Sequence, residues 1–274
     1  MKKILAVANQ KGGVGKTTTV INLAASLATA GRRVLLVDID PQANMTSGIG
    51  LRGQKAAAGN IYNILTATDG AALRDADAFM VPGFTPQLSV IPADRNLTGA
   101  EIEMVPLPGR EAQLRRFLTP LRERFDHIFI DCPPSLGLLT LNALVAADGV
   151  VIPLHCEYFA LEGLADLMTT LRRVKAGMNP GLDVDGVLLT MYDERTNLGQ
   201  QVASEVREFF KSKVFHTVIP RNVKLAEAPS HGMPVTTYDP KSRGAEAYNA
   251  LAREFLARAG QSLTTEHTES TEKK

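Results

Sequence analysis

The chain contains 274 residues, which is enough for one large α/β domain with a well-buried core or for two small domains. Hydrophobic residues make up 45% of the sequence and charged residues 22%, as is ordinary for a soluble globular protein. The formal net charge of +1 gives no bulk sign of a nucleic-acid binder, so any such surface must be a local basic patch. Tryptophan is absent and aromatic residues are sparse, which argues against a stacking platform for single-stranded nucleic acid.

The cysteines and the N-terminal segment indicate a cellular compartment. Cys132 and Cys156 form neither a CxxC pair nor a Cys/His cluster, so we expect two reduced thiols rather than a structural zinc site. The apolar N-terminal segment is short and ends at the polar residues 9–11, unlike a signal peptide. No run of 18 apolar residues occurs. We therefore expect a cytoplasmic protein that has no membrane partner.

Short apolar runs alternate along the chain with longer segments of helical period. Strands are expected at residues 4–8, 34–37, 88–91, 128–130, 149–154, 184–190 and 214–219. Helices are expected at residues 16–30, 114–121, 159–175, 199–210 and 245–257. The first helix carries an apolar stripe at i, i+3, i+4, i+7 and i+8 from Val20, and Gly31 ends it.

This alternation predicts an α/β fold, with a mostly parallel sheet and helices on both faces. Ligands of such sheets bind outside the carboxyl ends of the strands. Residues 51–87 are rich in Gly, Ala and Pro and have weak periodicity, so we interpret them as a peripheral excursion. We expect one domain over residues 1–260. Residues 261–274 are polar and nearly free of apolar side chains, which predicts a disordered tail.

The segment between the first strand and the first helix has the composition of a phosphate-binding P-loop. It consists of Lys11, Gly12, Gly13, Val14, Gly15, Lys16, Thr17 and Thr18. Glycines allow successive N–H groups to point at phosphate oxygens, and the start of the helix adds its positive dipole end. Lys16 can reach the β- and γ-phosphates of a nucleotide, and the Thr17 hydroxyl can ligate Mg²⁺.

One position departs from the ordinary pattern G-x-x-x-x-G-K-[ST], because Gln10 stands where the first glycine is expected. The segment instead has the form K-G-G-x-G-K-[ST] and resembles the deviant Walker A motif of the ParA/MinD superfamily of P-loop NTPases. The resemblance implies that Lys11 reaches across a dimer interface to the phosphates of the partner's nucleotide. A lysine supplied in trans would neutralise transition-state charge, as an arginine finger does, and would make a closed dimer depend on ATP.

Two predicted strands end in aspartates at the sheet edge where the P-loop is expected. Asp38 and Asp40 follow residues 34–37, and because they alternate along an extended chain their carboxylates share one face. Asp40 could position water, and Asp38 could support the magnesium shell. Asp131 follows an apolar strand and has the form of a Walker B carboxylate, which holds Mg²⁺ directly or through water.

The chain resembles the chromosomal ParA/Soj branch of this superfamily along almost its whole length. The segments that carry the resemblance are NQKGGVGKTTTVINLAASLA, VDIDPQAN, IDCPPSLGLLTLNAL, EYFALEG, LTMYDERTNLGQQV and VIPRNVKLAEAPSHG. The resemblance implies a DNA-segregation ATPase with ATP, ADP and Mg²⁺ as ligands. It also implies an ATP-dependent sandwich homodimer that binds double-stranded DNA of the nucleoid non-specifically. A ParB-like centromere-binding partner would stimulate slow hydrolysis.

The resemblance assigns roles to the residues already singled out. The catalytic residues would be Lys11, Lys16 and Asp40, with Asp40 serving hydrolysis. Magnesium would be held by Thr17, Asp40 and Asp131, and Asp131 would also begin a switch segment.

The resemblance also places the base and the DNA. The segments that flank the base would be Met191 with Tyr192, and Pro220 with Arg221 and Asn222. The residues that contact DNA phosphates across the dimer would be Arg195 and Lys224. A lysine at position 224 supplies charge without the bidentate fork of an arginine.

Two related families are alternatives. A MinD-like membrane ATPase would end in a basic amphipathic helix that lies in the lipid interface, whereas here the last predicted helix is followed by a polar tail of mixed charge. A nitrogenase-reductase-like electron carrier would bridge an iron–sulfur cluster through two cysteines per subunit. Cys132 directly follows Asp131, which does not match that pattern.

Overall fold

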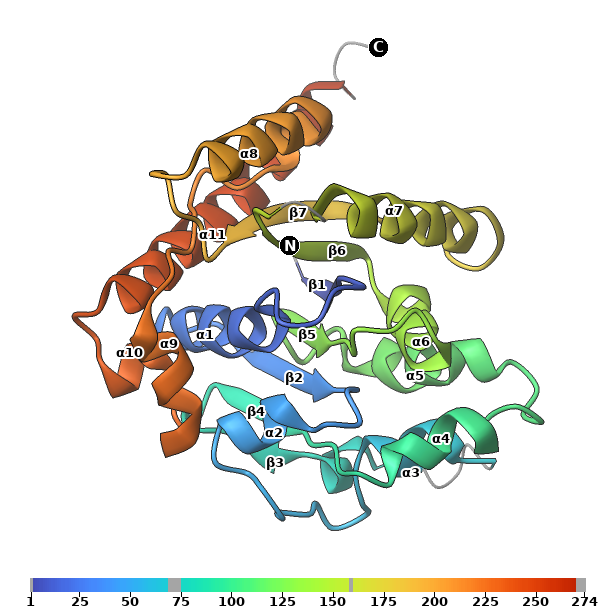
Figure 1. Cartoon of the computed structure of the whole chain (residues 1–274). Coiled ribbons are helices and arrows are strands. Elements are labelled where there is room, and N and C mark those ends of the chain that lie inside the picture. Colours follow the sequence, from blue (N-terminus) through green and yellow to red (C-terminus); the bar gives the residue numbers. More distant parts are fainter. Residues whose placement is uncertain (1, 69–74, 158–159, 270–274) are drawn as a thin grey trace.

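A seven-stranded sheet forms the centre of the molecule (Figure 1). The computed structural model describes residues 2–68, 75–157 and 160–269, with side chains described up to residue 260. The strands are β1 (Lys3–Val7), β2 (Val34–Asp38), β3 (Val81–Pro82), β4 (Leu88–Ile91), β5 (His127–Asp131), β6 (Gly149–His155) and β7 (Asp183–Thr190). Their order across the sheet is β3-β4-β2-β5-β1-β6-β7. All neighbours are parallel except β3 and β4.

Helices cover both faces of this sheet (Figure 1). The α-helices are α1 (Lys16–Thr29), α2 (Asn44–Gly48), α3 (Ile61–Thr66), α4 (Leu97–Glu103), α5 (Gln113–Leu118), α6 (Leu138–Ala146), α7 (Ala160–Gly177), α8 (Asn197–Phe210), α9 (Val223–Glu227), α10 (Val235–Tyr238) and α11 (Arg243–Glu269). The 3₁₀ helices are η2 (Ala76–Phe79), η3 (Arg110–Ala112), η4 (Thr119–Leu121), η5 (Lys211–Lys213) and η6 (Ala228–His231).

The two faces of the sheet carry separate hydrophobic clusters, because successive side chains of a strand point to opposite faces. On β1, Ile4 and Ala6 pack into one cluster with α3 to α8. Leu5 and Val7 pack into the other, with α1 and α11. The strands are buried on both sides, as a parallel sheet between helices requires. The predicted α/β fold, a mostly parallel sheet with helices on both faces, is confirmed.

The prediction of a strand at residues 214–219 is wrong. This segment lies beside β7, and the amide groups of Phe215 and Ile219 donate to the carbonyls of Val187 and Leu189, both at 2.9 Å. The amides between them are taken by a side chain instead: Glu254 of α11 accepts hydrogen bonds from residues 216 and 217, each at 2.8 Å. Because a carboxylate replaces the ladder partner, the segment is not a continuous strand.

The excursion at residues 51–87 has more structure than its composition indicated. It contains α3 and η2, and β3 pairs antiparallel with β4 at the edge of the sheet. Pro82 has no amide hydrogen to donate, so its place in this edge strand agrees with the general preference of proline.

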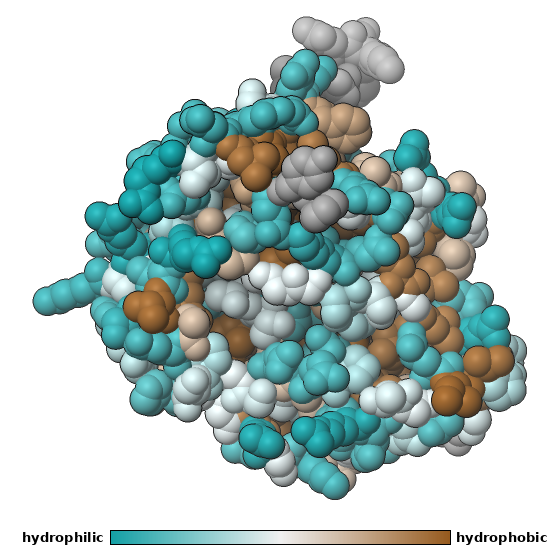
Figure 2. Space-filling model, in the orientation of Figure 1, coloured by the Kyte–Doolittle hydropathy of each residue, from teal (hydrophilic) through white to brown (hydrophobic). Residues whose placement is uncertain are grey.

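Several ends of elements differ from the predicted ones. Helix α11 includes residues 261–269, the first part of the segment for which the sequence predicted disorder, and residues 270–274 lie outside the described residues. The predicted start of a helix at residue 159 also lies outside them. Over the part of the chain that is described, no helix is long and apolar enough to cross a bilayer. The surface in Figure 2 is mostly hydrophilic, with smaller apolar patches.

Candidate functional site

The loop from β1 to α1 has the backbone form of a P-loop. Gly13 and Gly15 have φ angles of 72° and 86°, in the left-handed region that favours glycine. Gly15 is the N-cap residue of α1, and since no side chain caps this end, the first amide groups of the helix face outward for a ligand. A hydrogen bond from the end of β7 holds the loop in place: the Thr190 hydroxyl donates to the carbonyl of Val14 at 2.8 Å.

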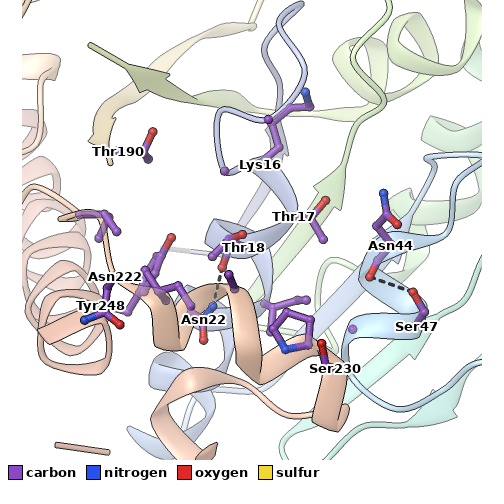
Figure 3. Close-up of a pocket in the computed structure, with 18 of the residues that line it drawn as sticks. Lys16, Thr17, Thr18, Asn22, Asn44, Ser47, Thr190, Asn222, Ser230 and Tyr248 are labelled. Atoms are coloured by element: carbon purple, nitrogen blue, oxygen red, sulfur yellow. Dashed lines mark hydrogen bonds between the residues drawn. The ribbon is translucent and has the colours of Figure 1, made fainter. Parts of the chain in front are cut away.

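A cleft of about 1220 Å³ opens over this loop, outside the carboxyl ends of the strands. Figure 3 shows Lys16, Thr17 and Thr18 of α1 along its floor, with Asn222 and Tyr248 toward one end and Asn44 and Ser47 toward the other. The predicted residues that line the cleft are Gly12, Gly13, Gly15, Lys16, Thr17, Thr18, Asp40, Met191, Pro220, Arg221 and Asn222. The fold therefore brings together four stretches that are separate in the sequence: residues 12–18, Asp40, Met191 and residues 220–222.

Two buried carboxylates lie side by side at the ends of neighbouring strands. Asp38 of β2 is in register with Asp131 of β5, and both are fully buried. The Thr17 hydroxyl donates to Oδ2 of Asp131 at 2.8 Å. Burial, together with the nearby charge of Asp38, raises the pKa of Asp131 well above its ordinary value. The site therefore disfavours negative charge on Asp131 unless a cation is supplied.

The donor set at Asp131 fits a magnesium ion. Its Oδ1 atom is buried and accepts no hydrogen bond from the described residues, and a buried acceptor of this kind fits a cation or a cation-bound water. Within the described residues, no three His, Cys, Asp or Glu side chains form a group suited to a metal. Mg²⁺ commonly takes one or two protein oxygens together with phosphate oxygens and water. The residues thus fit magnesium that arrives with a nucleotide.

Asp38 has a different environment from the one expected for a residue of the magnesium shell. Its Oδ2 accepts hydrogen bonds from the amide and the hydroxyl of Thr46, at 2.9 and 2.7 Å. Its Oδ1 accepts from the amide of Asp40 at 3.1 Å. Burial raises the pKa of Asp38 to about 6, although these hydrogen bonds act in the opposite direction. Asp38 therefore fixes α2 and the loop before it.

Asp40 lies on the wall of the cleft and is 6% exposed. Its Oδ1 accepts a hydrogen bond from the amide of Gln42 at 2.9 Å, which closes a tight turn. The carboxylate is thus oriented by the backbone that follows it, in the same cleft as Thr17.

The two P-loop lysines have different partners. Lys16 is 7% exposed and donates to the carbonyl of Lys11 at 2.9 Å. Burial lowers the pKa of Lys16, while the nearby carboxylates Asp131 and Asp40 act against that shift. Lys11 forms an ion pair with Glu157, which follows β6. His155 lies on the other oxygen of Glu157, at 3.4 Å.

The proposed base-binding segments lie side by side. The amide of Tyr192 donates to the carbonyl of Ile219 at 3.0 Å, and Tyr192 lies beside Pro220 as its bridge partner. Met191 has a φ of 47°, unusual for a residue with a side chain. The Asn222 side chain accepts from the amide of Lys224 at 2.9 Å and so caps α9.

Comparison with known proteins gives matches over most of the chain. A family model described as an AAA domain matches residues 2–184. The sporulation initiation inhibitor protein Soj of Bacillus subtilis is 56% identical over 260 residues, which cover 94% of this chain and 99% of that protein. The chromosome partitioning protein ParA of Myxococcus xanthus is 54% identical, covering 93% and 88%. The chain belongs to the ParA/Soj family.

A solved structure with the same fold holds a nucleotide. Cobyrinic acid a,c-diamide synthase from Mycobacterium smegmatis, with a bound ATP analogue and magnesium, is 38% identical to this ParA/Soj chain. The match covers 93% of this chain and 95% of that one, with a TM-score of 0.77. Structural relatives of the ParA/Soj chain therefore bind the ligands for which its cleft has suitable residues.

The two predicted DNA-binding residues of this ParA/Soj chain lie outside the lining of the cleft. The Arg195 side chain is 84% exposed and forms two hydrogen bonds to Asp193, at 2.8 and 2.6 Å. This pairing lowers the pKa of Asp193 to about 2. Lys224 is 37% exposed and pairs with Glu227 at 2.8 Å.

Sequence reasoning missed several residues that shape the ParA/Soj site. Thr190 holds the P-loop and ends a predicted strand, so a polar residue at a strand's carboxyl end was an available signal. Tyr248 of α11 lines the cleft, and its hydroxyl lies 3.2 Å from the Thr19 hydroxyl. Glu157 begins the EYFALEG segment, but its ion pair with Lys11 joins residues far apart in the sequence, and no local pattern predicts that pair.

Proposed function

We propose that this protein is an ATP-dependent DNA-segregation ATPase. ATP binding would drive a sandwich homodimer that binds DNA non-specifically, and hydrolysis stimulated by a ParB-like partner would release it. The observation that carries the proposal is the Asp131 Oδ1 atom, which no described residue contacts by a hydrogen bond, beside the Thr17 hydroxyl and an open helix N-terminus. Two relatives with more than 50% identity, named Soj and chromosome partitioning protein ParA, support a role in chromosome partitioning.

The P-loop residues supply nucleotide binding. Backbone amides of residues 12–18 and the start of α1 would hold the phosphates, and Lys16 would donate from inside the loop. Thr17 and Asp131, with Asp40 near them, would hold the magnesium ion. MgATP itself would supply the scissile phosphate and the divalent charge that stabilises the leaving group. Met191, Pro220, Arg221 and Asn222 would flank the base.

Asp40 and Lys11 would act on hydrolysis. We assign to Asp40 the orientation of the attacking water, because its carboxylate lies on the cleft wall and is oriented by a backbone turn. Lys11 would contact the phosphates of the partner subunit's nucleotide, after its ion pair with Glu157 opens. A cation added in this way favours a transition state with charge spread over the transferred phosphoryl group.

The proposed function also implies how the chain is divided into domains and where in the cell the protein acts. Residues 1–260 would form the single ATPase domain, and residues 261–274 a polar tail. The protein would act in the cytoplasm on the nucleoid, with Arg195 and Lys224 on DNA phosphates. The high identity to Soj and ParA favours this function over a MinD-like membrane ATPase or an iron–sulfur electron carrier.

Gel filtration and DNA binding, each measured with ATP, ADP and no nucleotide, test the proposal. We expect a dimer and tight duplex binding only with ATP and magnesium. The proposed function would be contradicted by a dimer that forms equally with ATP, with ADP and without nucleotide. DNA binding of equal affinity in these three states would also contradict it. Flotation with liposomes and the colour of the purified protein separate the two alternatives, since an iron–sulfur protein is coloured and a membrane ATPase floats with ATP.

A further inference from the structure

The short helix α2 is attached to Asp38 and, through it, to the loop that carries Asp40. Thr46 of α2 donates two hydrogen bonds to Asp38, and Asp38 accepts a third from the amide of Asp40. The carbonyl of Asp40 accepts from the amide of Ala43, directly before α2. A displacement of the Asp40 loop would therefore move α2, because the bonds at Asp38 are buried and costly to break.

A second unit begins at the base-binding segment and contains a proposed DNA-binding residue. Asn222 lines the cleft and caps α9, which carries Lys224 and leads without interruption into η6. The turn after η6 is closed at Gly232, whose amide donates to the carbonyl of Pro229 at 3.0 Å. Helices α9 and η6 thus follow one another directly and together form part of the cleft wall.

The two units touch through glycines. Gly50, just after α2, and Gly232, just after η6, have φ angles of 80° and 66°. A Cβ atom on Gly232 would lie 2.8 Å from Cα of Gly50, and one on Gly50 would lie 3.3 Å from the carbonyl oxygen of Gly232. Next to them, a Cβ on Gly48 would lie 3.4 Å from Pro229. In Figure 3 Ser47 of α2 and Ser230 of η6 lie on neighbouring walls of the cleft.

We propose that the Gly50–Gly232 contact transmits the nucleotide state from the Asp40 loop to α9 and its DNA-binding Lys224. Both backbones meet without intervening side chains, so a shift of α2 acts directly on η6 and cannot be absorbed by rotamer changes. Gly50 and Gly232 both line the cleft. Neither has a side chain that could contact a phosphate, so in this scheme they are positioning residues that act through the backbone. The inference rests on the proposed function, which requires DNA binding to depend on ATP.

Gly232→Ala is the test, with Gly53→Ala as its matched control. Gly53 has a φ of 78°, but a Cβ atom there would meet no atom of the described residues within 4 Å. Alanine at position 53 therefore carries the same kind of backbone strain without separating the two units. DNA affinity is measured with ADP and with a slowly hydrolysed ATP analogue on a duplex of arbitrary sequence. We expect the affinity of Gly232→Ala for the ATP analogue to stay within about threefold of that of the unaltered protein. The ratio of its DNA affinity with the analogue to its DNA affinity with ADP should fall about tenfold. Gly53→Ala should keep the ratio.

Hydrogen exchange at residues 223–232 gives a readout that does not use DNA. In the unaltered protein and in Gly53→Ala, the ATP analogue should change exchange in this segment; in Gly232→Ala it should not. If Gly232→Ala does not fold, Gly50→Ala serves, because its closest approach is less severe. An unchanged affinity ratio and exchange response in these variants would overturn the inference, as would an equal loss of nucleotide binding. The unaltered protein could show ATP-dependent hydrogen exchange at residues 223–232 without ATP-dependent DNA binding. In that case the proposed function fails, but the Gly50–Gly232 contact still transmits the nucleotide state to α9.

Discussion

The ammonium group of Lys16 is held inside the P-loop by a carbonyl, in a position where burial lowers its pKa. Nucleotide phosphates would stabilise this charge, so we expect Lys16→Ala to lose ATP affinity by about 100-fold, as removal of a charge-assisted hydrogen bond does. Titration with a fluorescent ATP analogue measures the effect. Lys175→Ala, on the exposed surface of α7, is the control and should bind normally. Ordinary affinity in Lys16→Ala would remove the basis for the phosphate site.

Asp40 has a carboxylate on the cleft wall that the backbone of Gln42 orients. We expect Asp40→Ala to retain ATP and DNA binding, because the amides of the P-loop remain, while turnover falls by at least about 100-fold because the attacking water is no longer oriented. Phosphate release in the presence of DNA and the ParB-like partner measures turnover, and gel filtration should show a trapped dimer. Normal hydrolysis by this variant would assign Asp40 some other role.

His127 is a buried imidazole away from the cleft, 3% exposed, and its Nδ1 has no hydrogen-bond partner in the described part of the chain. Burial lowers its pKa from 6.5 to about 4. Between those values the unfolded chain binds a proton that the folded chain does not. The free energy of unfolding should therefore fall as pH decreases from 6.5 to 4, by at most about 3 kcal/mol. Urea unfolding across this range should give a shallower pH dependence for His127→Leu; an unchanged slope would contradict the assignment.

Helices and strands were predictable from the sequence where the residues that specify them are close together in the chain. The run from β1 through the P-loop into α1 needs only an apolar strand, glycines and an amphipathic stripe, so its bounds were predictable. Residues 214–219 have the same apolar character, yet Glu254 of α11 takes their amides from a distant part of the chain. The role of Asp38 depends likewise on Thr46, which no periodic pattern marks.

Long-range pairing also limited what could be predicted of the site. The Asp131 carboxylate was found because it ends an apolar strand, but its buried place beside Asp38 follows from the order of strands in the sheet. Glu157 meets Lys11 only because β6 lies next to β1. Residue types therefore predicted the candidate phosphate and metal ligands, whereas the groups that position them could be recognised only from the three-dimensional structure.

The P-loop also supports a prediction about the dimer. A Cβ on Gly12 would lie 3.9 Å from Pro134, an ordinary contact, and Gly12 does not have a positive φ. Gly12→Val should therefore fold and bind ATP as a monomer, while its branched side chain blocks close approach of a partner subunit at Lys11. Light scattering with ATP should show a monomer. Gly13→Val, at a φ of 72°, is the contrasting variant and should impair the loop itself. An ATP-dependent dimer of Gly12→Val would contradict the sandwich geometry.

Positive and negative charges balance over the whole molecule, and they also balance locally at the proposed DNA-binding residues. The net charge is +1, and each proposed DNA-binding cation already has a carboxylate of the same chain beside it. Figure 2 shows mainly hydrophilic surface over α9 to α11, at the left of the view. A phosphate must therefore compete with Asp193 for Arg195 and with Glu227 for Lys224. One such patch binds weakly, and two on a rigid dimer would bind through high effective concentration.

Because carboxylates and phosphates compete for the same cations, two variants should have opposite effects on DNA binding. Arg195→Glu with Lys224→Glu should weaken binding to every duplex about equally, with the ATP-dependent dimer intact, because phosphate contacts carry no sequence information. The salt dependence should also become shallower, by about 0.9 in logarithmic slope for each phosphate that is no longer neutralised. Asp193→Asn should have the opposite effect, since it releases Arg195 from its bidentate partner without removing a cation. Filter binding on unrelated duplexes at two salt concentrations measures both. Unchanged affinity in the double variant, or weaker binding by Asp193→Asn, would show that DNA uses a different face of the dimer.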